Sequence, residues 1–439
     1  MKKNIESQYV LKGFSLLASH YGSMFFSIFF TFWLARLLDP ADFGRLVIGV
    51  FSLDIFNALT DWGWDQAILH EHEAQAEVVY ATHLKIRFFL GLIPLLVVAA
   101  TGYVKNISFF SDVHGIALLL ALAFLFEKIS LTYKTILERE YRLCQLAGLE
   151  IVSLVLSFVL ALVSVKNGFG VSALVVQRLS EKIFLCAGYV YASSWRFSRE
   201  FDFLLLKKWI HSFGIATACS GLVSLFLYDF MGAFIGVSHG THQGGLYARS
   251  FKMATLPLIF TTVCGRLATP LYATNVGNLE QLKKIFLLAQ MTKFLVILPI
   301  QAFLAFLAPV WMIIVLGESW RQAVPLYQLL CLYGALRAFY DDVPSLFLYG
   351  LRQPWIMFQQ HLVQGGALFF ATVVLCNFLT GAFCGAVVMT IGMFVGVVVL
   401  WIRTFFALHI SWNDCTDAIA TIYRYTLNFG RRLVGSRSE

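Results

Sequence analysis

Apolar stretches of about 20 residues recur along almost the whole of this 439-residue chain, separated by short polar connections. A helix needs about 20 apolar residues to cross the hydrocarbon core of a membrane, so each stretch is long enough for one span. Only 13% of the residues are charged, against about 25% in a soluble domain. The sequence therefore predicts an all-α, polytopic membrane protein. It excludes a soluble enzyme, a disordered scaffold and a secreted disulfide-rich domain.

We expect about 12 transmembrane helices and no sizeable extramembrane domain. The predicted spans are 12–35, 43–66, 84–103, 114–135, 144–165, 170–193, 210–235, 245–271, 284–308, 322–349, 355–378 and 382–407. After the last span, residues 411–439 carry four arginines separated by apolar residues. This pattern is typical of a segment that lies along the membrane surface, and we expect a basic cytoplasmic tail there.

Lysine and arginine are distributed unevenly between the predicted connections. With the N-terminus inside, 21 of the 33 basic residues fall on the inner side and six on the outer side. Because basic residues gather in cytoplasmic loops, this excess predicts that both termini are cytoplasmic. The same rule explains the formal net charge of +8 without a nucleic-acid partner.

Cysteine and histidine give no sign of a metal or cofactor site. The eight cysteines form no C-x-x-C pair, and most lie in apolar stretches, where cysteine behaves as a small hydrophobic residue. The pairs His70/His72 and His239/His242 have no further ligands near them in the sequence. Nothing resembles a catalytic triad or a phosphate-binding loop. We therefore expect no catalytic residues, no cofactor and no metal.

The chain shows a weak internal repeat. Gly13 and Gly214 are 201 residues apart, and so are Gly44 and Gly245, each near the start of a predicted span. A basic connection around Trp195–Lys208 separates the two sets of six spans. Transporters are commonly built from such repeats, with the substrate near the midplane. We predict an N-terminal lobe (1–199), a C-terminal lobe (200–410) and a tail (411–439), the lobes being six-helix bundles around a central cavity.

Six short stretches resemble motifs of one transporter family. They are Leu34–Gly44 (LARLLDPADFG), Thr60–Ala67 (TDWGWDQA), Leu137–Arg142 (LEREYR), Gly168–Leu174 (GFGVSAL), Gly245–Tyr247 (GLY) and Leu316–Trp320 (LGESW). In order and spacing the chain resembles the polysaccharide-transporter family of the multidrug/oligosaccharidyl-lipid/polysaccharide exporter superfamily. The resemblance implies a flippase of the Wzx type in the cytoplasmic (inner) membrane, which moves lipid-linked oligosaccharides across that membrane for O-antigen or exopolysaccharide synthesis.

Several cations lie within the predicted spans, where an ionisable group normally faces a cavity or a partner. The candidate substrate-binding residues are Arg178, Arg249, Lys252, Arg266, Lys293 and Arg337. Two of them have a structural alternative, since Arg178 can reach Glu181 at i+3 and Arg337 can reach Asp341 at i+4.

The span 245–271 contains cations but no acidic residue. Arg249 and Lys252 are three residues apart. Lys252 and Arg266 are 14 residues apart, close to four helical turns, so both should project from similar faces. Lys293 also lacks a carboxylate in its own span. Such unmatched cations fit a lipid pyrophosphate. In the alternative interpretation, Asp54, Asp61 or Asp229 pairs with them from other helices.

Carboxylates form the complementary feature on the span 43–66. Asp54, Asp61 and Asp65 recur at i+7 and i+4 and therefore share one stripe. Asp54, Asp61 and Asp229 are the candidate ion-coupling or gating residues, because a carboxylate in a low dielectric holds a proton more tightly or binds a cation. A structural salt bridge that holds one conformation closed is the alternative.

Three function hypotheses remain at this point. The first is a flippase for a polyprenyl-pyrophosphate-linked glycan. The expected partners of such a flippase are the lipid bilayer, a coupling proton or cation, and other polysaccharide-assembly proteins. The second is a cation-coupled multidrug or small-molecule exporter of the same superfamily, which the unmatched cations oppose. The third is a membrane glycan polymerase or ligase, which the short outer connections oppose.

Overall fold

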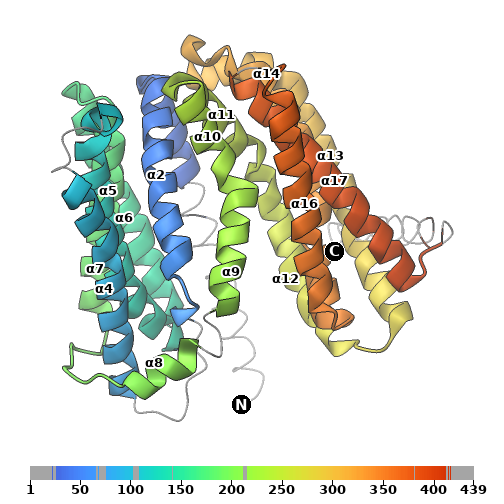
Figure 1. The fold of residues 1–439 in the computed structure, drawn as a ribbon, viewed down its shortest axis with the longest axis horizontal. Helices are drawn as coiled ribbons and strands as arrows, with labels where there is room; N and C mark the ends of the chain where they lie inside the picture. Colours follow the sequence, from blue (N-terminus) through green and yellow to red (C-terminus); the bar gives the residue numbers. More distant parts are fainter. Residues whose placement is uncertain are drawn as a thin grey trace, which may run out of the picture. The chain divides into compact units, whose positions relative to one another are not determined.

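The computed structural model describes residues 26–65, 76–101, 108–140, 142–210, 215–379 and 381–411, together with 22, 68, 414 and 416. All regular structure in these ranges is helical (Figure 1). The chain divides into two compact units, Met1–Gly245 and Leu246–Glu439. The boundary lies inside a helix, at the glycine of the predicted repeat. The lobes 1–199 and 200–410 remain a prediction from the sequence, and almost all of the tail 411–439 lies outside the described residues.

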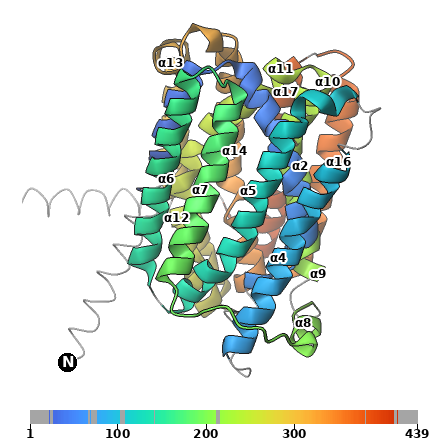
Figure 2. The ribbon, with the colours of Figure 1, turned by 90° about the vertical axis from the view of Figure 1, so that its left-hand side faces the viewer.

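Unit 1 is a bundle of long helices together with several shorter helical segments. They are Phe26–Leu37, α2 (Pro40–Thr60), α4 (Ala76–Thr101), α5 (Ser108–Arg139), α6 (Leu143–Lys166), α7 (Val171–Ala192), the short α8 (Phe203–Trp209), α9 (Ile215–Ser224), the π-helix η2 (Leu225–Asp229) and α10 (Phe230–Ser238). Helices α4, α5, α7 and α6 pack side by side, and Figure 2 shows them as one face of the unit. Helix α2 packs against α5, α9 and α10.

The start of α2 shows how the sequence sets a helix boundary. Asp39 has an extended backbone and its side chain accepts a hydrogen bond from the Ala41 amide at 2.8 Å. Pro40 follows at the first helical position, where a missing N–H costs nothing. The helix ends at Thr60, just before Asp61. Asp54 therefore lies in the second half of α2, and Asp61 directly follows the last residue of this helix.

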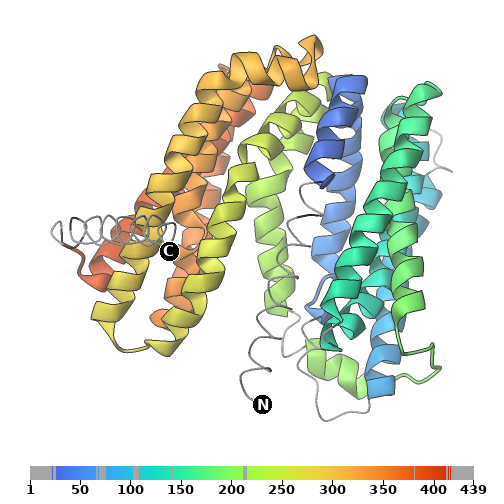
Figure 3. The same cartoon turned by 180° about the vertical axis from the view of Figure 1, so that it is seen from behind.

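Unit 2 consists of the remaining helices, which Figure 3 shows from behind. They are the greater part of α11 (Thr241–Ala254), η3 (Leu256–Leu258), α12 (Ile259–Thr274), α13 (Leu279–Leu316), η4 (Glu318–Trp320), α14 (Ala323–Tyr340), α15 (Val343–Ser345), η5 (Leu346–Gly350), α16 (Pro354–Leu375) and α17 (Gly381–Leu408). Long α13 packs against α12 and α14, while α17 packs against α14 and α16.

The surface of both units is suited to lipid. Large apolar side chains such as Phe306, Phe369 and Phe406 are more than 70% exposed. Among the described residues, eight helices are long and apolar enough to cross a membrane. The chain is therefore a multi-pass membrane protein, as predicted. The number of 12 spans stays a prediction, because most of the first span lies outside the described residues and α7, α14 and α16 are not among the eight.

Candidate functional site

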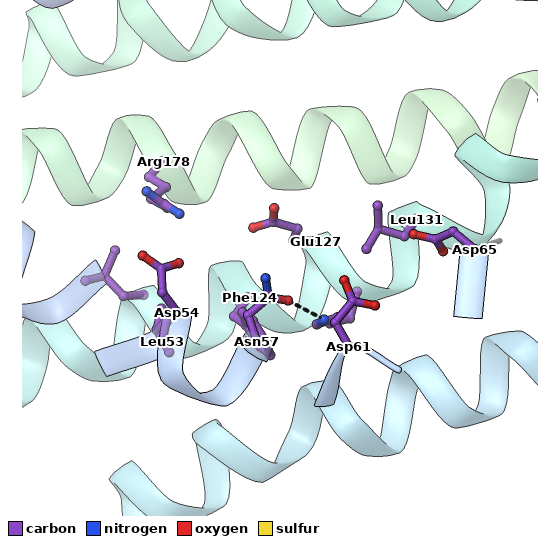
Figure 4. Close-up of a pocket in the computed structure, with 11 residues that line it drawn as sticks. Leu53, Asp54, Asn57, Asp61, Asp65, Phe124, Glu127, Leu131 and Arg178 are labelled. Atoms are coloured by element: carbon purple, nitrogen blue, oxygen red, sulfur yellow. Dashed lines mark hydrogen bonds between the residues drawn. The ribbon is translucent and has the colours of Figure 1, made fainter. Parts of the chain in front are cut away.

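Unit 1 contains a polar cavity of about 240 Å³ between α2, α5 and α7. Its charged lining residues are Asp54, Asp61 and Asp65 from α2 and the turn after it, Glu127 and Lys128 from α5, and Arg178 from α7. The predicted stripe of carboxylates does share one side of the chain, as Figure 4 shows. The structure thus brings Asp54, Asp61 and Arg178 to the same cavity.

Arg178 lies opposite Asp54 across this cavity (Figure 4). The two charges interact, but no ion pair within 4 Å holds Arg178 in the described part of the chain. The expected pair between Arg178 and Glu181 is therefore wrong, since the guanidinium turns toward α2. Asp229, an exposed residue of η2, is near enough for its charge to act on Asp54 as well.

The other charges on α5 have fixed partners on neighbouring helices. Glu127 forms an ion pair with Lys182 of α7 at 3.4 Å. Lys128 is 1% exposed and donates to the Asn57 side-chain oxygen at 2.6 Å. A lysine at this depth is tolerated because the amide oxygen of α2 replaces water as its hydrogen-bond acceptor.

The carboxylates at the C-terminal end of the stripe, Asp61 and Asp65, pair with a cation from α4. Arg87 is fully buried and pairs with Asp65 at 2.8 Å and with Asp61 at 3.4 Å. His83, one turn earlier, lies 3.3 Å from Asp65. Asp61 thus has a partner inside its own unit. Of the two carboxylates predicted for coupling on this helix, Asp54 is the one without a hydrogen bond or ion pair among the described residues.

Unit 2 contains a second cavity, of about 540 Å³, between α12 and the segment that joins α14 to α15. Arg266 of α12 lines it, together with Asp341, Asp342 and several hydroxyl side chains. Arg266 is exposed, and the described part of the chain gives it no hydrogen bond or ion pair. Of the predicted cations on the span 245–271, Arg266 lines one of these two cavities.

Lys293 is not an unmatched cation, contrary to the sequence-based interpretation. It is fully buried in α13 and forms an ion pair with Asp342, which is also buried. It further donates to the Ala338 carbonyl at 2.7 Å, while the Gln290 amide donates to Asp342 at 3.1 Å. A buried lysine and aspartate with these hydrogen bonds form a structural link between α13 and the end of α14.

The span predicted to carry the column of cations is not one regular helix. Helix α11 ends at Ala254, and the 3₁₀ turn η3 separates it from α12. Pro257 lies in this turn and lacks a backbone N–H, which removes one hydrogen bond of a regular helix there. Lys252 and Arg266 therefore lie on two successive helices, and the shared face stays a prediction from their spacing of 14 residues. Arg249 and Lys252 lie on α11, outside the residues that line either cavity.

The remaining prediction from local spacing is confirmed. Arg337 of α14 pairs with Asp341 at 3.3 Å, an i+4 contact. Two residues that the sequence did not single out are Arg87, counted as a loop charge, and Asp342, which lies beside the end of α14. The described residues contain no group of three or more histidine, cysteine or acidic side chains placed to hold a metal ion.

A family model described as "Polysaccharide biosynthesis protein" matches residues 33–325. The chain belongs to this family. It is 28% identical over 305 residues to the teichuronic acid biosynthesis protein TuaB of Bacillus subtilis, a match covering 63% of this chain and 61% of that protein. It is 21% identical over 379 residues to the lipopolysaccharide biosynthesis protein WzxC of Escherichia coli, covering 85% of this chain and 75% of that protein.

Solved structures show the same fold. An inward-facing multidrug resistance MATE family transporter of the MOP superfamily aligns with a TM-score of 0.68 at 17% identity, covering 88% of this chain and 94% of that one. The lipid II flippase MurJ aligns with a TM-score of 0.64 at 11% identity, covering 95% and 93%. The expected family and the all-α transporter fold are therefore confirmed.

Proposed function

We propose that this protein is a flippase that moves a polyprenyl-pyrophosphate-linked oligosaccharide from the inner to the outer leaflet of the cytoplasmic membrane. It works by alternating access in cell-surface polysaccharide biosynthesis. Arg266 carries the proposal, because it is exposed at a cavity in a membrane-spanning helix and is held by no ion pair within the described ranges. A cation at this depth is costly unless it serves a ligand or a partner, and a pyrophosphate supplies the matching charge. The names of the polysaccharide-biosynthesis relatives support this substrate class.

We expect Arg266→Ala to slow flipping by about tenfold to a hundredfold. The charge-assisted hydrogen bonds of one guanidinium to a phosphate contribute about 1.5–3 kcal/mol. Arg266→Lys should keep part of the activity, because lysine retains the charge but loses the fork of donors. The rate is measured in proteoliposomes, as the protection of a fluorescent polyprenyl-pyrophosphate glycan from an impermeant quencher.

Arg321→Ala is the matched control for this experiment. Arg321 follows η4 and pairs with Glu318 at 2.8 Å, with both side chains more than 65% exposed. The control should flip at the wild-type rate. A wild-type rate in Arg266→Ala, with equal amounts of protein in the membrane, would contradict the role given to Arg266.

Asp54 is the proposed coupling residue, because its carboxylate faces the cavity of unit 1 and has no fixed partner among the described residues. Asp54→Asn removes the charge and the exchangeable proton, so transport should fall to the rate measured without an ion gradient. Glu77→Gln, an exposed carboxylate in the first turn of α4, is the control. Full gradient-driven transport in Asp54→Asn would exclude coupling through this residue.

Export of a cationic small molecule is the second candidate function. The acidic cavity of unit 1 favours it, because Asp54 and Glu127 both line that cavity. Ethidium efflux that depends on Asp54, without any flipping of the glycolipid, would establish this alternative. Under either function we place both termini in the cytoplasm and expect no enzymatic activity.

A further inference from the structure

The cavity of unit 2 has a wall rich in hydrogen-bond acceptors. Three threonines of α12 line it, and each hydroxyl donates back to its own chain. Thr261 and Thr262 donate to the Leu258 carbonyl at 2.6 and 3.3 Å, and Thr269 donates to the Gly265 carbonyl at 2.8 Å. Because the hydroxyl protons are used in this way, the threonine oxygens are left with lone pairs and can only accept from a ligand.

Two carboxylates extend this acceptor surface on the opposite side. Asp342 is 2% exposed; one of its oxygens receives Lys293 and Gln290, while the other, Oδ2, has no hydrogen-bond partner in the described residues. A carboxylate oxygen has lone pairs for further donors, so this buried atom is an acceptor without a donor. Asp342 lies close to α12, since a Cβ added to Gly265 would be 3.6 Å from the Asp342 Cβ.

Few side chains that line the cavity can donate a hydrogen bond to a ligand. Among the lining residues, these donors are the Arg266 guanidinium and the Ser345 hydroxyl, which form no side-chain hydrogen bond within the described part of the chain. The second carboxylate, Asp341, already accepts from Arg337. A ligand that fits this cavity therefore brings several donors of its own and one anionic group. The volume of about 540 Å³ falls in the range of about 300–1,000 Å³ that is usual for small-ligand sites.

We propose that this cavity binds the sugar that adjoins the pyrophosphate, and that this sugar is uncharged. The inference rests on the flippase function proposed above. Arg266 takes the phosphate, while the sugar hydroxyls donate to the threonine oxygens and to Asp342. A uronate carboxylate can only accept hydrogen bonds, so at this position it would face threonine and aspartate oxygens that also only accept, while Arg266 is engaged by the phosphate.

Binding to the full-length protein in nanodiscs tests the proposal. The probes are citronellyl pyrophosphate, citronellyl-pyrophosphoryl-N-acetylglucosamine and citronellyl-pyrophosphoryl-glucuronic acid, and the Kd of each is measured by calorimetry. We expect the neutral glycolipid to bind at least about tenfold more tightly than the glucuronyl one. Asp341→Asn should reduce this difference, because the new side-chain amide gives the uronic acid a hydrogen-bond donor in the cavity.

Thr269→Val separates the sugar from the phosphate. Valine has nearly the shape of threonine but offers no acceptor, so the neutral glycolipid should bind about threefold to tenfold more weakly. Citronellyl pyrophosphate should bind as it does to the wild type. Thr274→Val is the matched control, because Thr274 lies on the same helix and donates to the Pro270 carbonyl at 3.1 Å but does not line the cavity.

The outcomes distinguish the two levels of the proposal. If none of the three probes binds to the wild-type protein, the flippase function itself fails. If the glycolipids bind with equal affinity, and Thr269→Val and Asp341→Asn leave all three Kd values unchanged, the flippase function stands and the assignment of the sugar to this cavity is overturned. A sugar-dependent loss in Thr269→Val, absent in Thr274→Val, supports it.

Discussion

Replacing Lys293 by methionine should lower the free energy of unfolding by about 3–5 kcal/mol. The lysine and its partner Asp342 are both buried, with side-chain exposures of 0% and 1%. Methionine fills much of the same volume but leaves the Asp342 carboxylate as an uncompensated charge inside unit 2. Titration of the detergent-solubilised protein with SDS, followed by tryptophan fluorescence, measures the effect.

The double variant Lys293→Met/Asp342→Asn is the decisive control. It removes both charges, so most of the lost stability should return, although the single substitution Asp342→Asn should also be destabilising because it leaves the lysine unpaired. The exposed pair of Glu318 and Arg321 gives the comparison for a surface interaction, where Arg321→Ala should cost less than about 1 kcal/mol. A double variant as unstable as Lys293→Met would show that packing, and not charge, is responsible.

The helices themselves were predictable from the sequence because a membrane imposes a length and a composition on each span. The predicted span 144–165 corresponds to α6 (Leu143–Lys166), and the predicted span 382–407 to α17 (Gly381–Leu408). The stripe of Asp54, Asp61 and Asp65 was predictable for a similar reason. It depends on the periodicity of one segment, and the three residues do line one cavity.

Partners on other helices were not predictable, because a single sequence does not show which helices pack together. Arg87 was counted with the inner connection because it lies near the start of the predicted span 84–103, whereas α4 begins at Ala76 and buries Arg87 within the bundle. Lys293 was judged unmatched because only carboxylates in its own span were considered. Its partner Asp342 is 49 residues away in the sequence.

The break between α11 and α12 is a local feature that the span prediction did not include. Its signal is local, since Pro257 stands in the middle of the predicted span 245–271. Hydropathy counts a proline in an apolar stretch as part of the span, and membrane helices do tolerate proline when other groups satisfy the backbone. Here the Thr255 hydroxyl donates to the Phe251 carbonyl at 3.0 Å beside the break. The cations on either side of it must therefore be considered separately.

The glycines of the predicted repeat meet in the structure. A Cβ added to Gly44 would lie 1.7 Å from the Thr241 carbonyl oxygen, and one added to Gly245 would lie 1.8 Å from the Pro40 carbonyl oxygen. Pro40 and Thr241 are themselves 201 residues apart, like the two glycines. The first turns of α2 and α11 therefore cross in a reciprocal contact in which each glycine leaves room for the backbone of the other helix.

Gly44→Ala should consequently destabilise the protein by about 3 kcal/mol or more, the upper end of what overpacking costs. The atom that the new methyl group meets is a backbone oxygen, which cannot turn away as a side chain can, so the two helices must separate. The same SDS titration measures the loss. Gly148→Ala in α6 is the control, since a Cβ there meets nothing within 4 Å and alanine favours a helix more than glycine does.

Gly245→Ala should cause a loss similar to that of Gly44→Ala, and the double variant should lose less than the sum of the two. Once the first methyl group has forced the crossing apart, the second finds space already open, which makes the two substitutions non-additive. If both single variants were as stable as Gly148→Ala, the helices could not cross at the distance that the structure gives. If the losses were fully additive, Gly44 and Gly245 would act at separate contacts, and the reciprocal crossing of α2 and α11 would be wrong.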